Sequence, residues 1–166
     1  MCRSCLSCRC LACWVVVLGA TISCLCARGQ GIQFSGPPPG EATAQIDGDR
    51  FEVANDAIVC RWSITDGRFK PVSIIDKFSG AMLSLDVERS ECFRIITDTA
   101  TLAASQMRIV DGPTVETIAP QPDSTTRAKR LAGKRIRLAL IDAAGELRVE
   151  WMAELRDGSN YVRPVV

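Results

Sequence analysis

Chemistry in this chain has to come from side chains other than histidine, because the sequence contains none. A Ser-His-Asp triad, a Cys-His dyad and a His-ligated zinc site are therefore excluded for the chain acting alone. Paired carboxylates can hydrolyse glycosides without histidine. Glu150 and Glu154 share one face of an expected strand, but four strand residues span about 13 Å. A glycosidase pair needs roughly 5–9.5 Å, so these two acids are not such a pair.

Three further acids, Asp86, Glu88 and Glu91, cluster after another expected strand. We interpret them as a solvated loop rather than as a catalytic set. No GxGxxG sequence, Walker A loop or EF-hand loop follows the first thirty residues. The sequence therefore predicts no catalytic residue, no cofactor and no metal site.

A run of basic residues without an intervening acid lies between Asp123 and Asp142. Its members are Arg127, Lys129, Arg130, Lys134, Arg135 and Arg137. Such a run could contact phosphate or sulfated polysaccharide. It has no interleaved aromatic residues, and the whole chain carries a net charge of only +1. We expect no nucleic-acid partner and interpret the run as a solvated loop leading into a strand, with polyanion binding as the alternative.

Cys60 and Cys92 are the only cysteines that follow residue 26. In an oxidising compartment they could close a disulfide, and we keep this pair as a candidate. Alternation along the expected strands places Cys60 on the same face as Trp62, whereas Cys92 lies on the face opposite Phe93. The pattern therefore favours two partly buried thiols.

The other seven cysteines fall within a segment typical of a signal peptide. They are Cys2, Cys5, Cys8, Cys10, Cys13, Cys24 and Cys26. Two arginines, Arg3 and Arg9, precede an apolar run from Leu11 to Leu25, which is short of the about 20 residues of a membrane helix. We predict a signal peptide at residues 1–29 and a secreted or periplasmic protein with no membrane contact after cleavage. The CxxC spacings as a metal site and Cys24 as a lipoprotein anchor are the alternatives.

Residues 30–42 are predicted to be a tether, because residues 36–40 read GPPPG and three consecutive prolines fit neither a helix nor a central strand. The folded domain is expected at residues 43–166.

Apolar residues recur at every second position of this domain, with turn residues between the runs. Residues 135–141 and 147–155 alternate most strictly, which indicates strands with one wet face. Residues 111–113 (DGP) are expected to be a turn and residues 119–127 an exposed loop. Trp62 and Trp151 fall on apolar faces and are predicted to be core rather than sugar-stacking residues. The pattern predicts an all-β fold, an antiparallel β-sandwich or barrel.

Four segments of this domain resemble a known family. They are FEVAND at 51–56, RWSITDG at 61–67, DKFSG at 76–80 and WMAELRDGSNYVR at 151–163. They are similar to the galactose-mutarotase-like β-sandwich that precedes the barrel of secreted α-galactosidase-like glycoside hydrolases. The likeness spans roughly residues 43–163.

In that family, the two catalytic aspartates belong to a (βα)₈ barrel beside the sandwich. The resemblance thus implies an incomplete supersandwich without its barrel, ending on a strand cut short at residues 164–166. No catalytic residue can be carried over, and mutarotases of this fold use histidine, which this chain lacks.

We therefore expect a non-catalytic N-terminal domain that supports the catalytic barrel of a larger protein and contacts carbohydrate. Asp157, Asn160 and Tyr161 offer hydrogen bonds and one stacking ring for a sugar, the alternative being a plain turn that closes the sheet. The alternative function is a free-standing secreted module, without enzyme activity, that binds protein at a sheet edge.

Overall fold

The computed structural model describes residues 36–98 and 100–166. The predicted signal peptide, the candidate lipid-anchor residue Cys24 and the first part of the tether lie outside these residues. The described part consists of antiparallel strands with two short 3-10 helices and no α-helix. The all-β prediction is confirmed.

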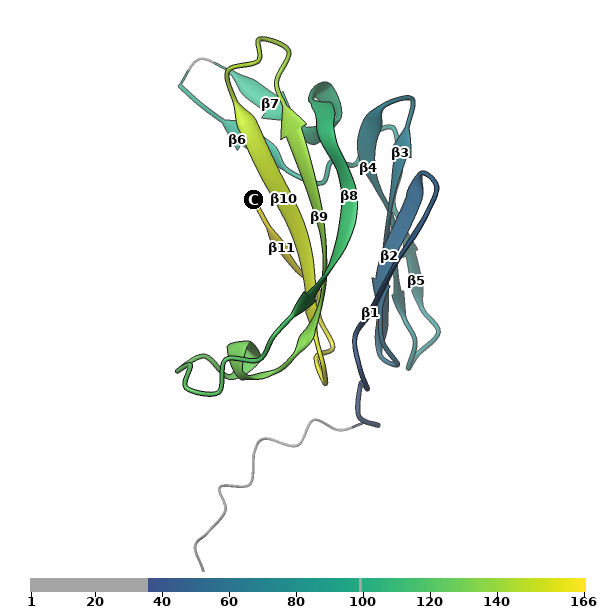
Figure 1. Cartoon of the computed structure of the whole chain (residues 1–166). Coiled ribbons are helices and arrows are strands. Elements are labelled where there is room, and N and C mark those ends of the chain that lie inside the picture. Colours follow the sequence, from purple (N-terminus) through teal and green to yellow (C-terminus); the bar gives the residue numbers. More distant parts are fainter. Residues whose placement is uncertain (1–35, 99) are drawn as a thin grey trace, which may run out of the picture. The chain divides into compact units, whose positions relative to one another are not determined.

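Two large sheets make up the domain (Figure 1). The first has five strands in chain order: β1 (Thr43–Asp47), β2 (Arg50–Ala54), β3 (Ile58–Thr65), β4 (Arg68–Asp76) and β5 (Met82–Ser84). The second has the order β11-β10-β9-β8, with β8 at Arg108–Ile118, β9 at Gly133–Ile141, β10 at Arg148–Arg156 and β11 at Arg163–Val165. A small hairpin, β6 (Arg94–Ile96) and β7 (Thr101–Ala103), joins them, followed by the 3-10 helix η1 (Ala104–Gln106). A second 3-10 helix, η2 (Arg127–Arg130), lies between β8 and β9.

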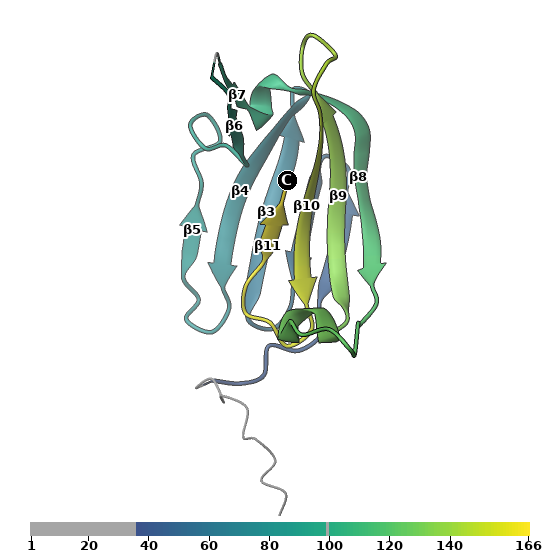
Figure 2. The same ribbon diagram turned by 90° about the vertical axis from the view of Figure 1, so that its left-hand side faces the viewer.

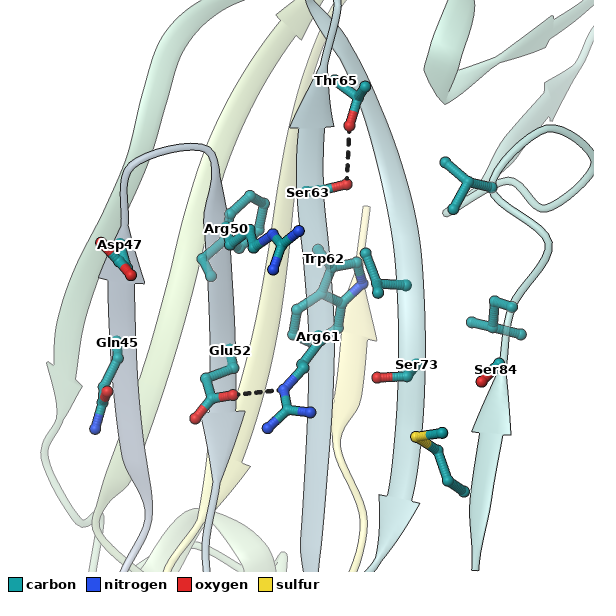
Figure 3. Close-up of a pocket in the computed structure, with 15 residues that line it drawn as sticks. Gln45, Asp47, Arg50, Glu52, Arg61, Trp62, Ser63, Thr65, Ser73 and Ser84 are labelled. Atoms are coloured by element: carbon teal, nitrogen blue, oxygen red, sulfur yellow. Dashed lines mark hydrogen bonds and ion pairs between the residues drawn. The ribbon is translucent and has the colours of Figure 1, made fainter.

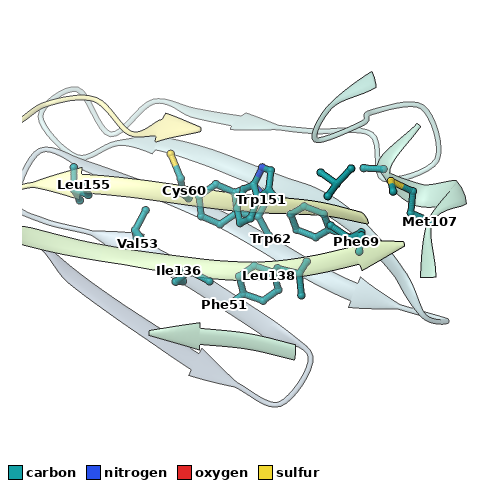
Figure 4. Close-up of a cluster of buried hydrophobic side chains, with 14 of the residues drawn as sticks. Phe51, Val53, Cys60, Trp62, Phe69, Met107, Ile136, Leu138, Trp151 and Leu155 are labelled. Carbon is teal, nitrogen blue, oxygen red and sulfur yellow. The ribbon is translucent and has the colours of Figure 1, made fainter. Parts of the chain in front are cut away.

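The two sheets face each other across one apolar core (Figure 4). Trp151 of β10 makes edge-to-face contacts with Trp62 of β3 and Phe69 of β4, at ring-centroid distances of 5.1 and 4.6 Å. Trp151 is 1% exposed and Trp62 is 9% exposed, which confirms that both tryptophans are core residues. The core therefore consists of the inward-facing side chains, every second residue of each strand, packed between the two sheets.

The strictest alternation in the sequence gives the central hairpin. Residues 133–141 and 148–156 pair in an unbroken register as β9 and β10, and their inward apolar side chains are fully buried or nearly so. Leu147 is an exception, because the strand starts one residue later and Leu147 lies in the preceding turn, 37% exposed.

The turn expected at residues 111–113 is instead part of β8, which runs on through Gly112 and Pro113. The register of β8 against β9 shifts on both sides of Asp111, so the extra residues are absorbed as bulges. β8 is an edge strand of its sheet (Figure 2), where a proline without an N–H group is tolerated.

The connection between β5 and β8 is pinned by a buried ion pair. Lys70 Nζ of β4 lies 2.9 Å from Glu91 Oε1, and the two side chains are only 8% and 12% exposed. Glu91 also accepts hydrogen bonds from the backbone N–H and the hydroxyl of Ser105. The interpretation of Glu91 as part of a solvated loop is therefore wrong, whereas Asp86 and Glu88 are exposed.

Candidate functional site

The turn after β10 was expected to hold the sugar-contacting residues. In the structure it is hydrogen-bonded to two distant segments of the domain. Asp157 Oδ1 accepts the backbone N–H of Ala42 at 2.8 Å, which ties the start of the domain to this turn. The buried Asn55 side chain, between β2 and β3, donates to the carbonyl of Ser159 at 2.6 Å. Asp157 thus has a structural role, with one carboxylate oxygen already bonded.

The other two predicted contact residues are accessible. Asn160 is exposed and Tyr161 is 54% exposed. Tyr161 and Ser159 line a cavity of about 260 Å³, together with residues of η2, β10 and β11. The structure therefore places Tyr161 at a cavity and Asp157 in a structural clamp, and does not bring Asp157 to the cavity wall.

A larger site lies on the outer face of the five-stranded sheet, where a groove of about 730 Å³ crosses all five strands (Figure 3). Its polar lining is supplied by Gln45 and Asp47 of β1, Arg50 and Glu52 of β2, Arg61, Ser63 and Thr65 of β3, Ser73 of β4 and Ser84 of β5. Apolar surface is added by Val72, Met82, Leu85 and Val87.

Few of these polar groups are bonded to one another. Arg61 Nε donates to Glu52 Oε2 at 2.8 Å, and the hydroxyls of Ser63 and Thr65 are 3.3 Å apart. Register places Arg61 beside both Glu52 and Ser73, and Ser73 beside Ser84, so these four lie on one side of the sheet. The groove therefore presents a row of carboxylate, guanidinium and hydroxyl groups held on strands.

The sequence did not predict this groove, because its only local signal is unspecific. The residues that alternate with the buried positions of β1–β3 are polar, but the same is true of any strand with one wet face. The groove spans five neighbouring strands and includes a register shift between Arg61 and Trp62, and a local sequence pattern shows neither the strand order nor the shift.

The basic run divides into two parts. Arg127, Lys129 and Arg130 are exposed on or beside η2, whereas Lys134, Arg135 and Arg137 belong to β9. The run therefore does lead from a loop region into a strand.

Two of the three β9 members, Arg135 and Arg137, are neutralised by neighbouring carboxylates, whereas Lys134 Nζ donates to the hydroxyl of Thr117 at 2.8 Å. Arg135 Nε donates to Glu116 Oε2 of β8 at 2.6 Å, and Arg135 also pairs with Glu154 of β10 at 3.6 Å. Arg137 pairs with Glu150 of β10, whose hydrogen bond raises the pKa of the Arg137 guanidinium above its ordinary value. The two arginines therefore offer little unbalanced charge to a polyanion, and Lys134 is the one cation of this part of the run without a carboxylate partner among the described residues.

Cys60 and Cys92 are free thiols in the structure, without the candidate disulfide between them. Cys92 precedes β6, which begins only at Arg94, so the alternation used to place it does not apply, and Cys92 and Phe93 both pack against the core. Burial raises the pKa of Cys60 to about 11. Burial, aided by the charge of Glu91, also raises the pKa of Cys92. Both thiols are thus protonated at neutral pH and are poor nucleophiles.

Residues 36–98 and 100–166 contain no group of three or more Cys, Asp and Glu side chains placed to hold a metal ion. No helix in this part of the chain is both long enough and apolar enough to cross a membrane.

Comparisons with protein-family models, with curated proteins and with solved structures found no match to this chain. The groove and the cavity described above are therefore interpreted from their own geometry.

Proposed function

We propose that this chain is a non-catalytic β-sandwich domain of a secreted glycoside-hydrolase-like protein, which contacts carbohydrate and supports a catalytic barrel. The observation that carries the proposal is the groove on the outer face of β1–β5. The galactose-mutarotase-like form of the sandwich and the signal peptide are part of the same proposal, and they rest on the sequence resemblance.

The chemistry of the groove suits a saccharide. Sugar hydroxyls both donate and accept hydrogen bonds, and the groove offers acceptors at Asp47 and Glu52, donors at Arg50 and Arg61, and hydroxyls at Ser63, Thr65, Ser73 and Ser84. These groups lie on strands of one sheet, so their positions are fixed before a ligand arrives and little ordering has to accompany binding. An open groove that crosses five strands accommodates several linked sugars rather than one enclosed ring.

The test is a titration of the full chain with neutral oligosaccharides of different linkage, followed by NMR of backbone amides. We expect shifts confined to groove residues of β1–β5. Arg61→Ala removes a charged donor from the groove and should weaken binding about tenfold.

Arg137→Ala is the matched control, since Arg137 also pairs with a glutamate of the adjacent strand but lies on the other sheet. It should leave the affinity unchanged. Equal losses for both variants, or no shift in the groove with any saccharide, would contradict the proposal.

The barrel-supporting part of the proposal has its own test, the intact mass of the native secreted protein. A mass far above 18.0 kDa would support a larger enzyme that includes this domain. A mass below that value, after loss of a signal peptide, would contradict the glycoside-hydrolase context while leaving saccharide binding open to the titration.

A second candidate function, a protein-binding module, is favoured by an uncovered part of the inner sheet face. Register places Leu83 of β5 and Ile74 of β4 on the same side as the core residue Cys60 of β3. Yet Leu83 is 59% exposed and Ile74 39%, because the opposing sheet has four strands and ends at the short edge strand β11 (Figure 2). An extended segment of a partner could pair with β11 and cover these side chains.

Adjacent residues provide the control for this candidate. Leu83→Asp should release a partner that copurifies with the native protein, as measured by sedimentation. Met82→Asp, equally exposed at 60% but on the outer face, should retain it. A native protein that sediments as a lone monomer would exclude this function.

A further inference from the structure

We infer that the cavity beside Tyr161 is a binding site for the anionic group, sulfate or carboxylate, of an acidic saccharide. The cavity has a volume of about 260 Å³ and is lined by η2, the C-terminal half of β10, the following turn and the start of β11. It lies on the second sheet and shares no lining residue with the groove on β1–β5, so the inference goes beyond the function proposed above.

The charge of the cavity wall is predominantly positive. Lys129, Arg156 and Arg163 supply three cations, and Glu154 is the single acid among the lining residues. Glu154 is shared between Arg135, at 3.6 Å, and Arg156, at 3.9 Å. Its one negative charge is thus already divided between two guanidinium groups.

The two outer cations of the cavity are left without a counter-ion. Among the described residues no carboxylate lies within ion-pair distance of Lys129 or Arg163, and both residues are exposed. Arg163 is the register partner of Glu154, the acid that Arg135 and Arg156 already engage. An anion between Lys129 and Arg163 would therefore gain charge-assisted hydrogen bonds without breaking an existing pair.

The third cation is held in place. Arg156 Nη1 donates to the carbonyl of Leu131 at 2.9 Å, and the side chain is only 14% exposed. Its guanidinium is thus oriented before a ligand binds, which lowers the entropic cost of binding.

The remaining lining residues favour a saccharide over a bare inorganic anion. The Tyr161 ring, 54% exposed, offers a face for a sugar ring, while Thr126 and Ser159 are the hydroxyl-bearing residues of the wall. The Ser159 hydroxyl already bonds the backbone of Tyr161, which fixes the turn that carries the ring. A sugar with one charged substituent would contact the ring and the cations together.

The rest of the basic run does not extend this site. Arg135 and Arg137 are paired with Glu116, Glu150 and Glu154. Lys134 has no carboxylate partner among the described residues, but it donates to the Thr117 hydroxyl and does not line the cavity. The polyanion-binding alternative drawn from the sequence therefore moves from the whole run to a cavity in which only Lys129 belongs to the run.

The test is calorimetric titration of the full chain with three probes of equal length: a heparin-derived hexasaccharide, its desulfated counterpart and a hexagalacturonate. Uronic acids give all three probes carboxylates, so binding of the first probe alone identifies sulfate as the recognised group, whereas binding of the second and third as well identifies carboxylate. The double variant Lys129→Ala/Arg163→Ala should weaken that binding at least about tenfold, since it removes two charged donors.

The matched control is Arg127→Ala/Arg130→Ala, which also removes two positive charges. Both of these arginines lie on η2, and neither lines the cavity. It should weaken binding no more than about twofold, because exposed charges outside the site act only through screened, longer-range attraction. Tyr161→Phe should keep the affinity and Tyr161→Ala should lower it, while groove variants such as Arg61→Ala should leave it unchanged.

Equal losses in the two double variants would show a general attraction of polyanions and overturn the inference, as would failure of all three probes to bind. Loss of affinity in Arg61→Ala rather than in the cavity variants would assign the acidic saccharide to the groove instead. Circular dichroism of each variant verifies that the fold is retained.

Discussion

The outer faces of the two sheets carry similar residue types but organise them in opposite ways. On the four-stranded sheet, Glu116, Arg135 and Glu154 are register partners on three adjacent strands and form a continuous row of opposite charges. On the five-stranded sheet, Arg61 and Glu52 form a surface ion pair in the groove, and a second pair, Lys70 with Glu91, is buried. The remaining polar side chains there line the groove.

The difference shows that a wet sheet face becomes a binding face only where its polar groups are not already paired. A ligand that contacts the Arg135 row has to compete with carboxylates that are in place, so little free energy remains to be gained. In the groove, polar side chains outside the Arg61–Glu52 and Ser63–Thr65 contacts exchange only hydrogen bonds to water for hydrogen bonds to a ligand. The alternation that makes each strand amphipathic is the same in both sheets, and the neighbouring strands decide the outcome.

The largest expected change in the free energy of unfolding tests whether the two sheets unfold as one cooperative unit. Trp151→Ala removes the side chain of β10 that contacts Trp62 and Phe69 of the other sheet, and should lower the free energy of unfolding by about 3–5 kcal/mol. Urea denaturation followed by circular dichroism measures the change.

Two variants set the scale for this loss. Leu147→Ala, at a 37% exposed position, should stay within about 0.5 kcal/mol of the parent. Trp151→Phe should cost less than the alanine variant, because it keeps an aromatic ring and removes the buried indole N–H, which has no hydrogen-bond partner. If Trp151→Ala costs no more than Leu147→Ala, the two sheets do not share a core.

The next effect contrasts the buried ion pair of the five-stranded sheet with the surface row of the other. Glu91→Gln leaves Lys70 without its counter-charge at an 8% exposed position and should cost about 3 kcal/mol, far more than any single surface pair. Glu88→Gln, an exposed acid of the same connection, is the control and should cost little.

The loss from Glu91→Gln should also depend on pH. Burial alone would raise the pKa of Glu91, but the hydrogen bonds from Lys70 and Ser105 and the charge of Lys70 together outweigh it, and the pKa lies below its ordinary 4.5. The ionised carboxylate therefore stabilises the fold above pH 4.5, and this contribution disappears as the pH falls through the lowered folded-state pKa. The difference between parent and variant should be full at pH 6 and shrink in strong acid, and a difference that stays constant would show that the charge of Glu91 is unimportant.

The sequence predicted the strands correctly where apolar and polar residues alternate strictly, because this period of two is a direct consequence of strand geometry. The strict alternation of residues 135–141 and 147–155 predicted β9 and β10 and most of their buried residues, since successive side chains of a strand point to opposite faces. It missed β1 and β7, which are short and half exposed, and it broke β8 at Gly112 because a Gly-Pro pair is typical of turns as well as of bulged edge strands.

The candidate sites were harder to predict, because each depends on residues that come together only in the fold. Tyr161 was expected to meet a sugar beside Asp157, but its cavity partner Lys129 comes from η2, and Asp157 faces Ala42 instead. Glu91 was expected in a solvated loop, and nothing in its neighbourhood along the chain indicates that Lys70 lies above it.

The smallest expected change in stability gives the sharpest test of the comparison between the two outer faces. Glu116→Gln withdraws the carboxylate that binds Arg135 at 2.6 Å and approaches Arg137 at 3.9 Å, and leaves these arginines with Glu154 and Glu150 alone. Because Glu116 is about one-third exposed, the free energy of unfolding should change by less than about 1 kcal/mol. The row itself should nevertheless begin to bind anions, in addition to the cavity beside Tyr161, and the variant should elute from a heparin column at higher salt than the parent. Glu146→Gln makes the same change in net charge at an exposed turn, and it should elute with the parent. If both variants shift equally, net charge governs retention and the pairing of charges on this face does not matter. If only Glu116→Gln shifts, the neutralised row is what confines anion binding on this sheet to the cavity beside Tyr161.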